Sequence, residues 1–308
     1  MDFERIFSNM RQTTELAYAK INLCLDVTGR RENGYHEIDG VMQSVTLCDE
    51  ITVSFEEADG IEIVLTAEGN DDMPTDERNL AYKAAARLLE TAETTGRVEI
   101  HIKKRIPMAG GLAGGSTDGA AVLRGLNRLL PDPLSVSALC QIGSRLGADV
   151  PFCIVGGAMR TRGIGDLLTP VPSMPDCHIV ISRRGEGVST PWAYGKLDEL
   201  YDNFRADAPR PSSDLERLLS GLECGDLEQI CNTVYNIFEP VVSQLQSDVS
   251  ALRSEMTKHG ALISRMSGSG PSVFGIFRDE ASAKTACAAL RDMGADAFVC
   301  RPFSQNFS

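Results

Sequence analysis

Residues 107–118 read PMAGGLAGGSTD, and this glycine-rich stretch decides how the rest of the chain is interpreted. Immediately before it, Val98, Ile100 and Ile102 alternate with polar residues, which predicts a strand with one buried face. After it, apolar residues at helical spacing run from 122 to 130, and Pro131 marks the expected end of a helix. Glycines between a strand and a helix leave backbone N–H groups and a helix N-terminus accessible to an anion. The stretch therefore predicts a phosphate-binding loop.

The common phosphate-loop signatures do not describe this stretch. It lacks the Gly-Lys-Ser/Thr ending of the Walker A loop, and the Gly-x-Gly runs elsewhere in the chain lack the third glycine of the dinucleotide fingerprint. Ser116 stands in Gly-x-Ser-x-Asp rather than Gly-x-Ser-x-Gly, so serine hydrolase chemistry is poorly supported. A flexible linker or a packing turn stays open as the alternative, although the position between strand and helix argues against a linker.

The composition predicts an ordinary folded protein of two domains. The chain has 308 residues, of which 43% are apolar and 24% are charged, and this balance disfavours disorder, collagen and coiled coil. Glycines and prolines crowd residues 156–175, which places a domain junction near residue 165. We therefore expect domains at 1–165 and 166–308.

The charge and the cysteines restrict the partners and the compartment. A formal net charge of −13 repels nucleic acid and anionic membranes, so an anionic ligand needs a local site. The first 15 residues are polar, and no apolar run reaches the roughly 20 residues that span a bilayer. The nine cysteines form no Cys-x-x-Cys pair, and the four histidines form no ligand-spaced cluster. We expect a cytoplasmic protein with free thiols, no structural zinc, and neither nucleic acid nor membrane as a partner; the oligomeric state stays unknown.

Periodicity places the remaining elements and favours the α+β fold class. Period-two alternation predicts a half-buried strand over 21–27, with Lys20 and Asn22 on its polar face, and antiparallel-looking strands over 51–55 and 61–65. Helices are expected over 80–89, from Ser135 to about Gly147, from Thr190 onward, along 241–256 and over 281–293, with strands at 272–277 and 297–300.

Several polar residues are candidates for chemistry, each with a bland alternative. Residues 103–105, Lys-Lys-Arg, could offset the acidic charge for a polyphosphate or form a solvated strand end. Asp149 follows a helix, where a carboxylate meets the unfavourable end of the helix dipole, or it is a turn aspartate. Lys20 alone would more often be a surface lysine. Residues 268–271, Gly-Ser-Gly-Pro, form either a hairpin turn or a second backbone clamp near the glycine loop.

Taken together, these segments resemble the GHMP kinases, a superfamily that includes galactokinase, homoserine kinase and mevalonate kinase. Residues 107–118 resemble the phosphate loop of that superfamily, and residues 268–275 (GSGPSVFG) resemble its C-terminal glycine motif. Residues 19–23 (AKINL) and 29–36 (GRRENGYH) resemble the branch whose acceptor carries a cytidine diphosphate. The resemblance runs from residue 19 to about 277. It implies a two-domain GHMP kinase fold: an N-terminal ATP-binding domain of ribosomal-protein-S5-like type and a ferredoxin-like α+β C-terminal substrate-binding domain.

The resemblance also implies roles for individual residues. The catalytic pair falls on Lys20 and Asp149. The positions that match ATP contacts are Pro107, Met108, Ala109, Gly110, Gly111, Leu112, Ala113, Gly114, Gly115, Ser116 and Thr117 around the triphosphate, with Asn79, Leu80 and Lys104 lining the adenine. The positions that match contacts to the cytidine diphosphate are Asn22, Tyr35, His36 and Tyr194. Thr117 and Gly119 stand where Ser and Ala are more usual, and Gly119 is expected to loosen the helix start.

The implied reaction is phosphorylation of the acceptor's 2-hydroxyl by ATP, with Mg²⁺ bridging the phosphates. Asp149 would accept the hydroxyl proton, and Lys20 would stabilise the developing charge. Aromatic rings at Tyr35 and Tyr194 would stack on the cytosine. Two alternatives stay open: another small-molecule GHMP kinase of the homoserine or mevalonate kinase type, and a catalytically silent nucleotide-binding or sensor protein.

Overall fold

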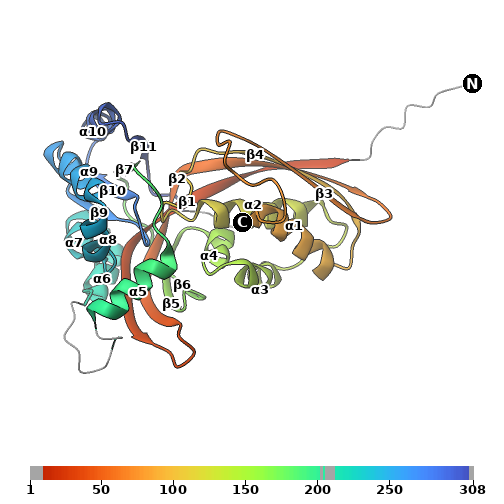
Figure 1. The fold of residues 1–308 in the computed structure, drawn as a ribbon, viewed down its shortest axis with the longest axis horizontal. Helices are drawn as coiled ribbons and strands as arrows, with labels where there is room; N and C mark the ends of the chain where they lie inside the picture. The colour runs from red at the N-terminus through yellow and green to blue at the C-terminus, as the bar shows by residue number, and fades with distance from the viewer. Residues whose placement is uncertain (1–9, 202–203, 205–211, 305–308) are drawn as a thin grey trace, which may run out of the picture. The chain divides into compact units, whose positions relative to one another are not determined.

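The computed structural model describes residues 10–201, 204 and 212–304, which divide into two compact units (Figure 1). Unit 1 comprises Met1–Ala17, Asp49–Arg105 and Gly115–Ile154, and unit 2 comprises Tyr18–Cys48, Ile106–Gly114 and Val155–Ser308. Neither unit is continuous in sequence, because the long strands β1 (Arg11–Arg30) and β2 (His36–Glu57) contribute residues to both. The expected domain boundary near residue 165 stays a prediction, because the two compact units follow different boundaries along the chain.

Unit 1 contains a sheet in which β4 (Gly96–Lys103) pairs with β2 and with β3 (Ile61–Glu68). The pairing of β4 with β2 is antiparallel, but β3 and β4 are parallel. The strands expected at 51–55 and 61–65 belong to β2 and β3; they run in opposite directions, with β4 paired between them. The parallel pair is joined through helix α1 (Leu80–Thr91), since parallel neighbours need such a crossover.

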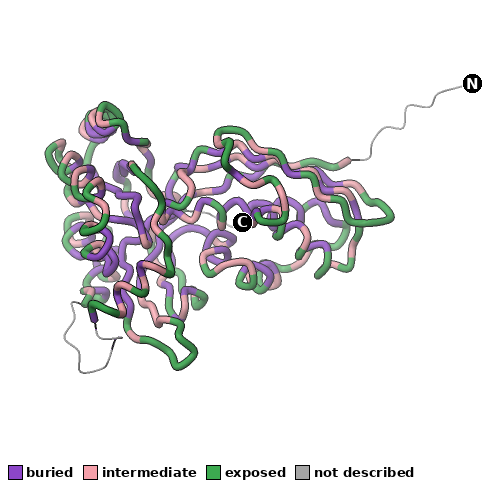
Figure 2. The backbone as a smooth tube through the Cα atoms, in the orientation of Figure 1, coloured by how far each residue is buried: buried purple, intermediate pink, exposed green. Residues whose placement is uncertain are grey.

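Helices cover one side of this sheet. In Figure 1, α1, α2 (Gly114–Leu129), α3 (Val136–Leu146) and α4 (Val150–Val155) lie below the strands of unit 1. As the alternation predicted, Val98, Ile100 and Ile102 of β4 are buried. Most of the apolar face predicted for α1 is buried as well, although Leu80 is half-buried, and Figure 2 shows buried backbone in both elements. The core of unit 1 is thus formed by every second residue of the strand and by one face of the helix, as their periods of 2 and 3.6 residues require.

Unit 2 contains a four-stranded antiparallel sheet of order β11-β7-β10-β9. The strands are β7 (His178–Arg183), β9 (Ile263–Met266), β10 (Val273–Phe277) and β11 (Asp296–Cys300). Helices α9 (Ser247–Lys258) and α10 (Glu280–Asp292) pack against it (Figure 1). Helix α9 directly precedes β9, and helix α10 joins β10 to β11; with this strand order, the sheet confirms the predicted ferredoxin-like α+β arrangement.

Both faces of that sheet are buried. In β7, Val180 packs in one apolar cluster with α9 and α10, whereas Ile179 and Ile181 pack in another with β1 and with helices α6 and α7. The remaining elements of unit 2 are β5 (Ala158–Gly163), β6 (Leu167–Pro170), α5 (Thr190–Leu200), α6 (Leu215–Cys224), α7 (Leu227–Thr233), β8 (Tyr235–Asn236) and α8 (Glu239–Leu245). Strand β8 runs parallel to β1, and β5 runs antiparallel to β2.

The helix predicted along 241–256 is two helices. Gln246 has φ −120° and ψ 96°, an extended conformation that ends α8 and begins α9. Its side-chain amide donates to the Glu186 carbonyl at 3.1 Å. Glutamine has good helix propensity, so the apolar spacing alone does not reveal the break. Among the helices of the described residues, none combines the length and apolar character needed to cross a bilayer.

Candidate functional site

The first half of the glycine loop, residues 107–114, lies in unit 2 and packs closely on other backbone. Gly111 has φ +77°, and a Cβ placed there would lie 2.1 Å from the Ser267 carbonyl oxygen. At Gly110 a Cβ would lie 2.4 Å from Ser272 Oγ. At Gly111 only glycine fits without moving the chain, whereas at Gly110 an added Cβ would displace the Ser272 side chain.

The segment that holds this loop is the second glycine motif, residues 267–272. It connects β9 and β10, which are antiparallel neighbours, so it is a hairpin turn. It also binds the first loop: the Ser272 N–H donates to the Gly110 carbonyl at 3.2 Å, and Ser267 Oγ donates to the Gly111 carbonyl at 3.0 Å. Both interpretations of this motif, turn and backbone clamp, are therefore confirmed.

Lys20 and Asn22 on β1 lie against both loops. The Lys20 backbone N–H donates to the Leu112 carbonyl at 3.2 Å, and Lys20 Nζ donates to Asn22 Oδ1 at 2.6 Å. The same Asn22 oxygen accepts from the Gly268 N–H at 3.0 Å. The sequence therefore identified three segments that the fold of unit 2 brings together.

Two expectations about β1 are corrected. Lys20 is only 4% exposed, so the surface-lysine alternative is wrong. The strand is also not half-buried, because residues 19–27 are buried on both faces. On one face of the strand, Ile21 and Leu23 pack in an apolar core of unit 2. On the other face, Lys20 and Asn22 lie next to the glycine loops.

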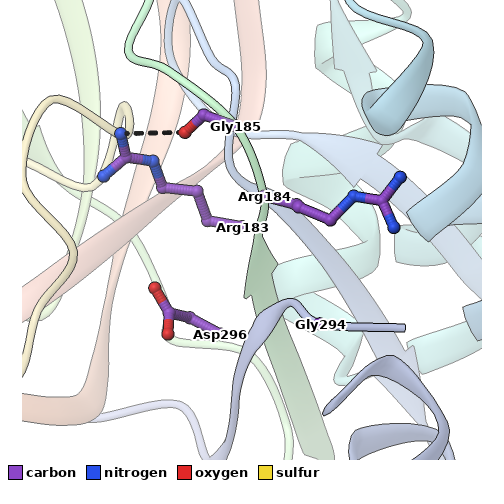
Figure 3. Close-up of a pocket in the computed structure, with 5 residues that line it drawn as sticks. All are labelled: Arg183, Arg184, Gly185, Gly294 and Asp296. Carbon is purple, nitrogen blue, oxygen red and sulfur yellow. Dashed lines mark hydrogen bonds between the residues drawn. The ribbon is translucent and has the colours of Figure 1, made fainter. Parts of the chain in front are cut away.

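Arg183, at the end of β7, also contacts the loop and was not identified from the sequence. Its guanidinium donates to the Met108 carbonyl and, at 3.4 Å, to the Gly185 carbonyl (Figure 3). Burial lowers the pKa of Arg183. Arg184 points to the other side of the strand, where its Nε donates to Asp248 Oδ1 at 2.9 Å (Figure 3). An arginine at the end of a strand carries no local signal, which explains why Arg183 was missed.

In unit 1, the second half of the loop forms the first turn of α2. A Cβ placed on Gly147 would lie 4.0 Å from Ser116 Oγ, so the loop of residues 147–149 passes beside Ser116. Asp149 is half-buried and directly precedes α4, and its carbonyl accepts from the Cys153 N–H at 3.0 Å. Our dipole argument is corrected here, because Asp149 stands at the start of a short helix, where a negative charge is favoured.

Lys104 takes part in a buried ion cluster. Its Nζ donates to Asp49 Oδ2 and to Asp118 Oδ2, at 2.6 Å each, and Lys104 is 8% exposed. Lys103 binds Glu50 at 3.0 Å on the other face of β4. Residues 103–105 are therefore not three cations on one edge, because alternation along the strand separates two of them and carboxylates bind both. The adenine-lining role of Lys104 stays a prediction.

The surroundings in this ion cluster shift the pKa values of Asp118 and Lys104. Burial raises the pKa of Asp118 to about 7; the Lys104 ammonium opposes this rise, and the nearby Asp49 carboxylate adds to it. Burial lowers the pKa of Lys104, but the two carboxylates more than offset that effect, so its pKa lies above the usual value. The Lys104 ammonium is thus the cation that both buried carboxylates bind, and burial destabilises the ionised form of Asp118.

Asn79 and Leu80 hold the start of α1 next to α2. Asn79 caps the helix, since its Oδ1 accepts from the Ala81 N–H at 2.9 Å. A Cβ on Gly119 would lie 3.3 Å from the Leu80 carbonyl oxygen, and one on Gly115 would lie 3.8 Å from Leu80 Cδ1. Gly119 therefore permits a close approach of the two helices. The adenine-lining roles of Asn79 and Leu80 stay predictions.

All four predicted acceptor residues lie in unit 2, and two of them, His36 and Tyr194, meet. The His36 ring stacks on Tyr194 with centroids 4.5 Å apart, and His36 Nε2 lies 2.7 Å from Asp198 Oδ1. Tyr35 is 60% exposed, and its ring stacks on no other ring in the described part of the chain. A face of Tyr194 is therefore covered by His36 rather than facing Tyr35. Asp198 was not predicted, since an aspartate on a helix is unremarkable in sequence.

Comparison with known proteins gives consistent results over most of the chain. Residues 79–157 match the family model for the GHMP kinases N terminal domain, and residues 215–296 match the model for GHMP kinases C terminal. A 4-diphosphocytidyl-2-C-methyl-D-erythritol kinase from Acetivibrio thermocellus is 41% identical, with 92% of this chain and 96% of the relative covered. The kinase of the same name from Exiguobacterium sibiricum is also 41% identical, with 94% and 98% covered.

Solved structures agree with these relatives. A crystal structure of 4-(cytidine 5'-diphospho)-2C-methyl-D-erythritol kinase has a TM-score of 0.78 and 32% identity, with 95% of this chain and 100% of that chain covered. The homoserine kinase of Cytophaga hutchinsonii has a TM-score of 0.73 at 20% identity, with 99% and 97% covered, and supports the fold alone.

Proposed function

The chain belongs to the GHMP kinase family, and from that premise we propose that it transfers the γ-phosphoryl group of ATP to the 2-hydroxyl of 4-diphosphocytidyl-2-C-methyl-D-erythritol. The products are the 2-phosphate and ADP, in the non-mevalonate route to isoprenoids, and we place the enzyme in the cytoplasm. The observation that carries the choice of substrate is the name shared by relatives that match 92% and 94% of this chain.

The triphosphate is assigned to the glycine loop. Gly111 places the main chain of the loop against the main chain at Ser267, and α2 begins at the end of the loop. Backbone N–H groups and a helix N-terminus bind phosphate oxygens without a side chain in the way. The ordered contacts to residues 267–272 support a loop that is shaped before ATP arrives, and positioning is the largest contribution a protein makes to phosphoryl transfer.

The proton transfer is assigned to Asp149 and the charge stabilisation to Lys20. A carboxylate within reach of the acceptor hydroxyl accepts its proton as the oxygen attacks phosphorus. Lys20, held by Asn22 at 2.6 Å, supplies a fixed cation in a buried environment, where a charge acts more strongly than in water.

Mg²⁺ belongs to this proposal as the ion that arrives with ATP. No group of three or more His, Cys, Asp and Glu side chains among the described residues could hold a metal by itself. Mg²⁺ is usually held by substrate phosphates and few protein oxygens, and the Ser116 hydroxyl beside the 147–149 loop fits that donor set. When bound, the ion would neutralise charge on the phosphates.

A panel of alcohols tests the function. Purified protein is incubated with ATP, Mg²⁺ and, in turn, the cytidine-diphosphate-linked erythritol, homoserine, mevalonate and galactose, and both ADP and the phosphorylated product are measured. We expect product only from the first acceptor. Product from homoserine or mevalonate instead would select another GHMP kinase activity, and ATP binding without any product would favour a silent nucleotide-binding protein.

The Asp149→Asn variant tests the assigned base. Its turnover is expected to fall about 10²- to 10⁴-fold, because an amide cannot accept the hydroxyl proton, while affinity for a non-hydrolysable ATP analogue stays the same. Asp132→Asn, which changes an exposed carboxylate of the same unit, is the matched control and should keep full turnover. Near-wild-type turnover in Asp149→Asn would refute the assignment.

A further inference from the structure

The side chain of Asn236 binds the backbone at the start of the second glycine motif. Asn236 is 4% exposed and lies on β8, where it pairs with Leu25 of β1. Its Nδ2 donates to the Met266 carbonyl at 2.7 Å and to the Gly268 carbonyl at 2.9 Å. Its Oδ1 accepts from the Phe238 N–H at 2.9 Å. Both hydrogens of the amide are used, so the side chain is fixed in one orientation.

Glu239, the first residue of α8, holds the same stretch of backbone. Its Oε2 accepts from the Met266 N–H at 2.8 Å. Its Oε1 lies 2.7 Å from a guanidinium nitrogen of Arg253, which restrains the carboxylate. The short segment 236–239 therefore binds the backbone of residues 266–268 through two buried or half-buried side chains.

The N–H of Gly268 connects this backbone to Lys20. It donates to Asn22 Oδ1 at 3.0 Å, and the same oxygen accepts from Lys20 Nζ at 2.6 Å. Asn22 and Lys20 are 2% and 4% exposed, and hydrogen bonds in such dry surroundings are stronger than in water. The position of Gly268 therefore helps to fix the oxygen that holds the Lys20 ammonium.

We propose that Asn236 is a positioning residue for phosphoryl transfer: it holds Gly268, and through Gly268 and Asn22 it fixes the Lys20 ammonium. This inference rests on the proposed function, in which Lys20 stabilises the charge that develops on the phosphoryl group. Such stabilisation requires a donor that is in place before the reaction begins. A displacement of about 1 Å, caused by a change far from the reacting atoms, can lower the rate about 100-fold.

Steady-state kinetics of Asn236→Ala test the positioning. We expect kcat to fall about 10- to 100-fold. The KM for ATP should change little, because Ser267 and Ser272 keep their hydrogen bonds to the glycine loop. Asn127→Ala is the matched control: Asn127 is also a buried amide, 7% exposed, but it binds the Leu134 backbone in unit 1. This control should lose stability and keep the kcat of the wild type.

A double-variant cycle with Lys20→Met separates positioning from general damage to the fold. If Asn236 acts through the Lys20 ammonium, its removal from the Lys20→Met protein has nothing further to displace. We therefore expect Lys20→Met and the double variant to have the same kcat. A further loss of about 10- to 100-fold in the double variant would overturn the inference, because Asn236 would then act independently of Lys20. Unchanged kcat in Asn236→Ala would overturn it as well.

Hydrogen exchange at the Gly268 amide tests the contact without a substrate. We expect this amide to exchange faster in Asn236→Ala than in the wild type, and at the wild-type rate in Asn127→Ala. If Asn236→Ala does not fold, Asn236→Ser, which keeps one donor, replaces it in each measurement. Equal exchange rates in the wild type and the Asn236 variant would overturn the inference. Absence of any product from the wild type would refute the proposed function, while the exchange rates would still decide whether Asn236 holds Gly268.

Discussion

Two regions of unit 2 are built in opposite ways. The loop pair, residues 107–114 with 267–272, meets mainly through main-chain atoms, with Gly111 so close to Ser267 that a Cβ would lie 2.1 Å from its carbonyl oxygen. The acceptor cluster, formed by His36, Tyr194 and Asp198, meets only through side chains, and its central contact joins His36 and Asp198 across 162 residues of sequence. The loop pair depends on glycines that have no side chain, and the acceptor cluster depends on the rings and charges of its side chains.

This difference matches two tasks: the loop pair provides a shape that binds phosphate, and the acceptor cluster provides selectivity for one base. Triphosphate oxygens are equivalent acceptors, so closely packed backbone N–H groups are sufficient to bind them. A pyrimidine must be distinguished from similar rings, and this requires a stacking face and a hydrogen-bonding atom in a fixed direction. We therefore expect the loop pair to tolerate almost no added volume, and the acceptor cluster to tolerate substitution with a loss confined to the acceptor.

The largest effect is expected from Gly111→Ala. Its positive φ and the overlap with the Ser267 carbonyl together should lower the free energy of unfolding by about 3–5 kcal/mol. Urea denaturation measures it. Gly115→Ala is the matched control, since a Cβ there would make an ordinary 3.8 Å contact in a helix and should change stability by less than about 1 kcal/mol. Equal stabilities of the two variants would mean that the loop pair is not held by close backbone packing.

A smaller effect, dependent on pH, is expected at Asp118 in the unit 1 ion cluster. Like the acceptor cluster, this cluster is held by side chains, but its contacts are ion pairs and not stacked rings. Because the folded pKa of Asp118 is raised to about 7, its favourable contribution is complete below about pH 4 and is lost as the pH rises through 7. Relative to wild type, Asp118→Asn should therefore gain about 2–3 kcal/mol of stability between pH 5 and pH 8.

Urea denaturation of both proteins at the two pH values measures this gain. Lys104 does not contribute to the change, because its pKa is raised from a value already above this window. The exposed Asp132→Asn variant should show no such gain. Parallel stability curves for Asp118→Asn and wild type would contradict a raised pKa at Asp118.

The sequence predicted what local patterns encode. Alternation gave the buried positions of β4, and the glycines gave both loops of the loop pair, since close backbone approach excludes every other residue. The resemblance to the GHMP kinases supplied Lys20 and Asn22, which the fold places against those loops. The chemical roles of Lys20, Asp149 and the adenine-lining residues stay predictions.

What the sequence did not predict depends on distant partners. Asp198 pairs with His36, and Lys104 pairs with Asp49, 55 residues away, and with Asp118. No periodicity reports such pairs, because each residue alone is an ordinary charged residue in its element. The break at Gln246 was missed for a related reason: its contact with the Glu186 carbonyl is tertiary, and it overrides the helix propensity of glutamine.

The most direct test of the division between the two regions is a pair of titrations on wild type and Tyr194→Ala, one with the cytidine-linked acceptor and one with a non-hydrolysable ATP analogue. Loss of an aromatic stacking face costs about 1–3 kcal/mol per base, so the acceptor should bind roughly 5- to 150-fold more weakly. The affinity for the ATP analogue should be unchanged, because the loop pair contains no part of Tyr194. Equal acceptor affinities in the two proteins, or a joint loss of ATP affinity and stability, would show that Tyr194 only packs in the core and would contradict the account.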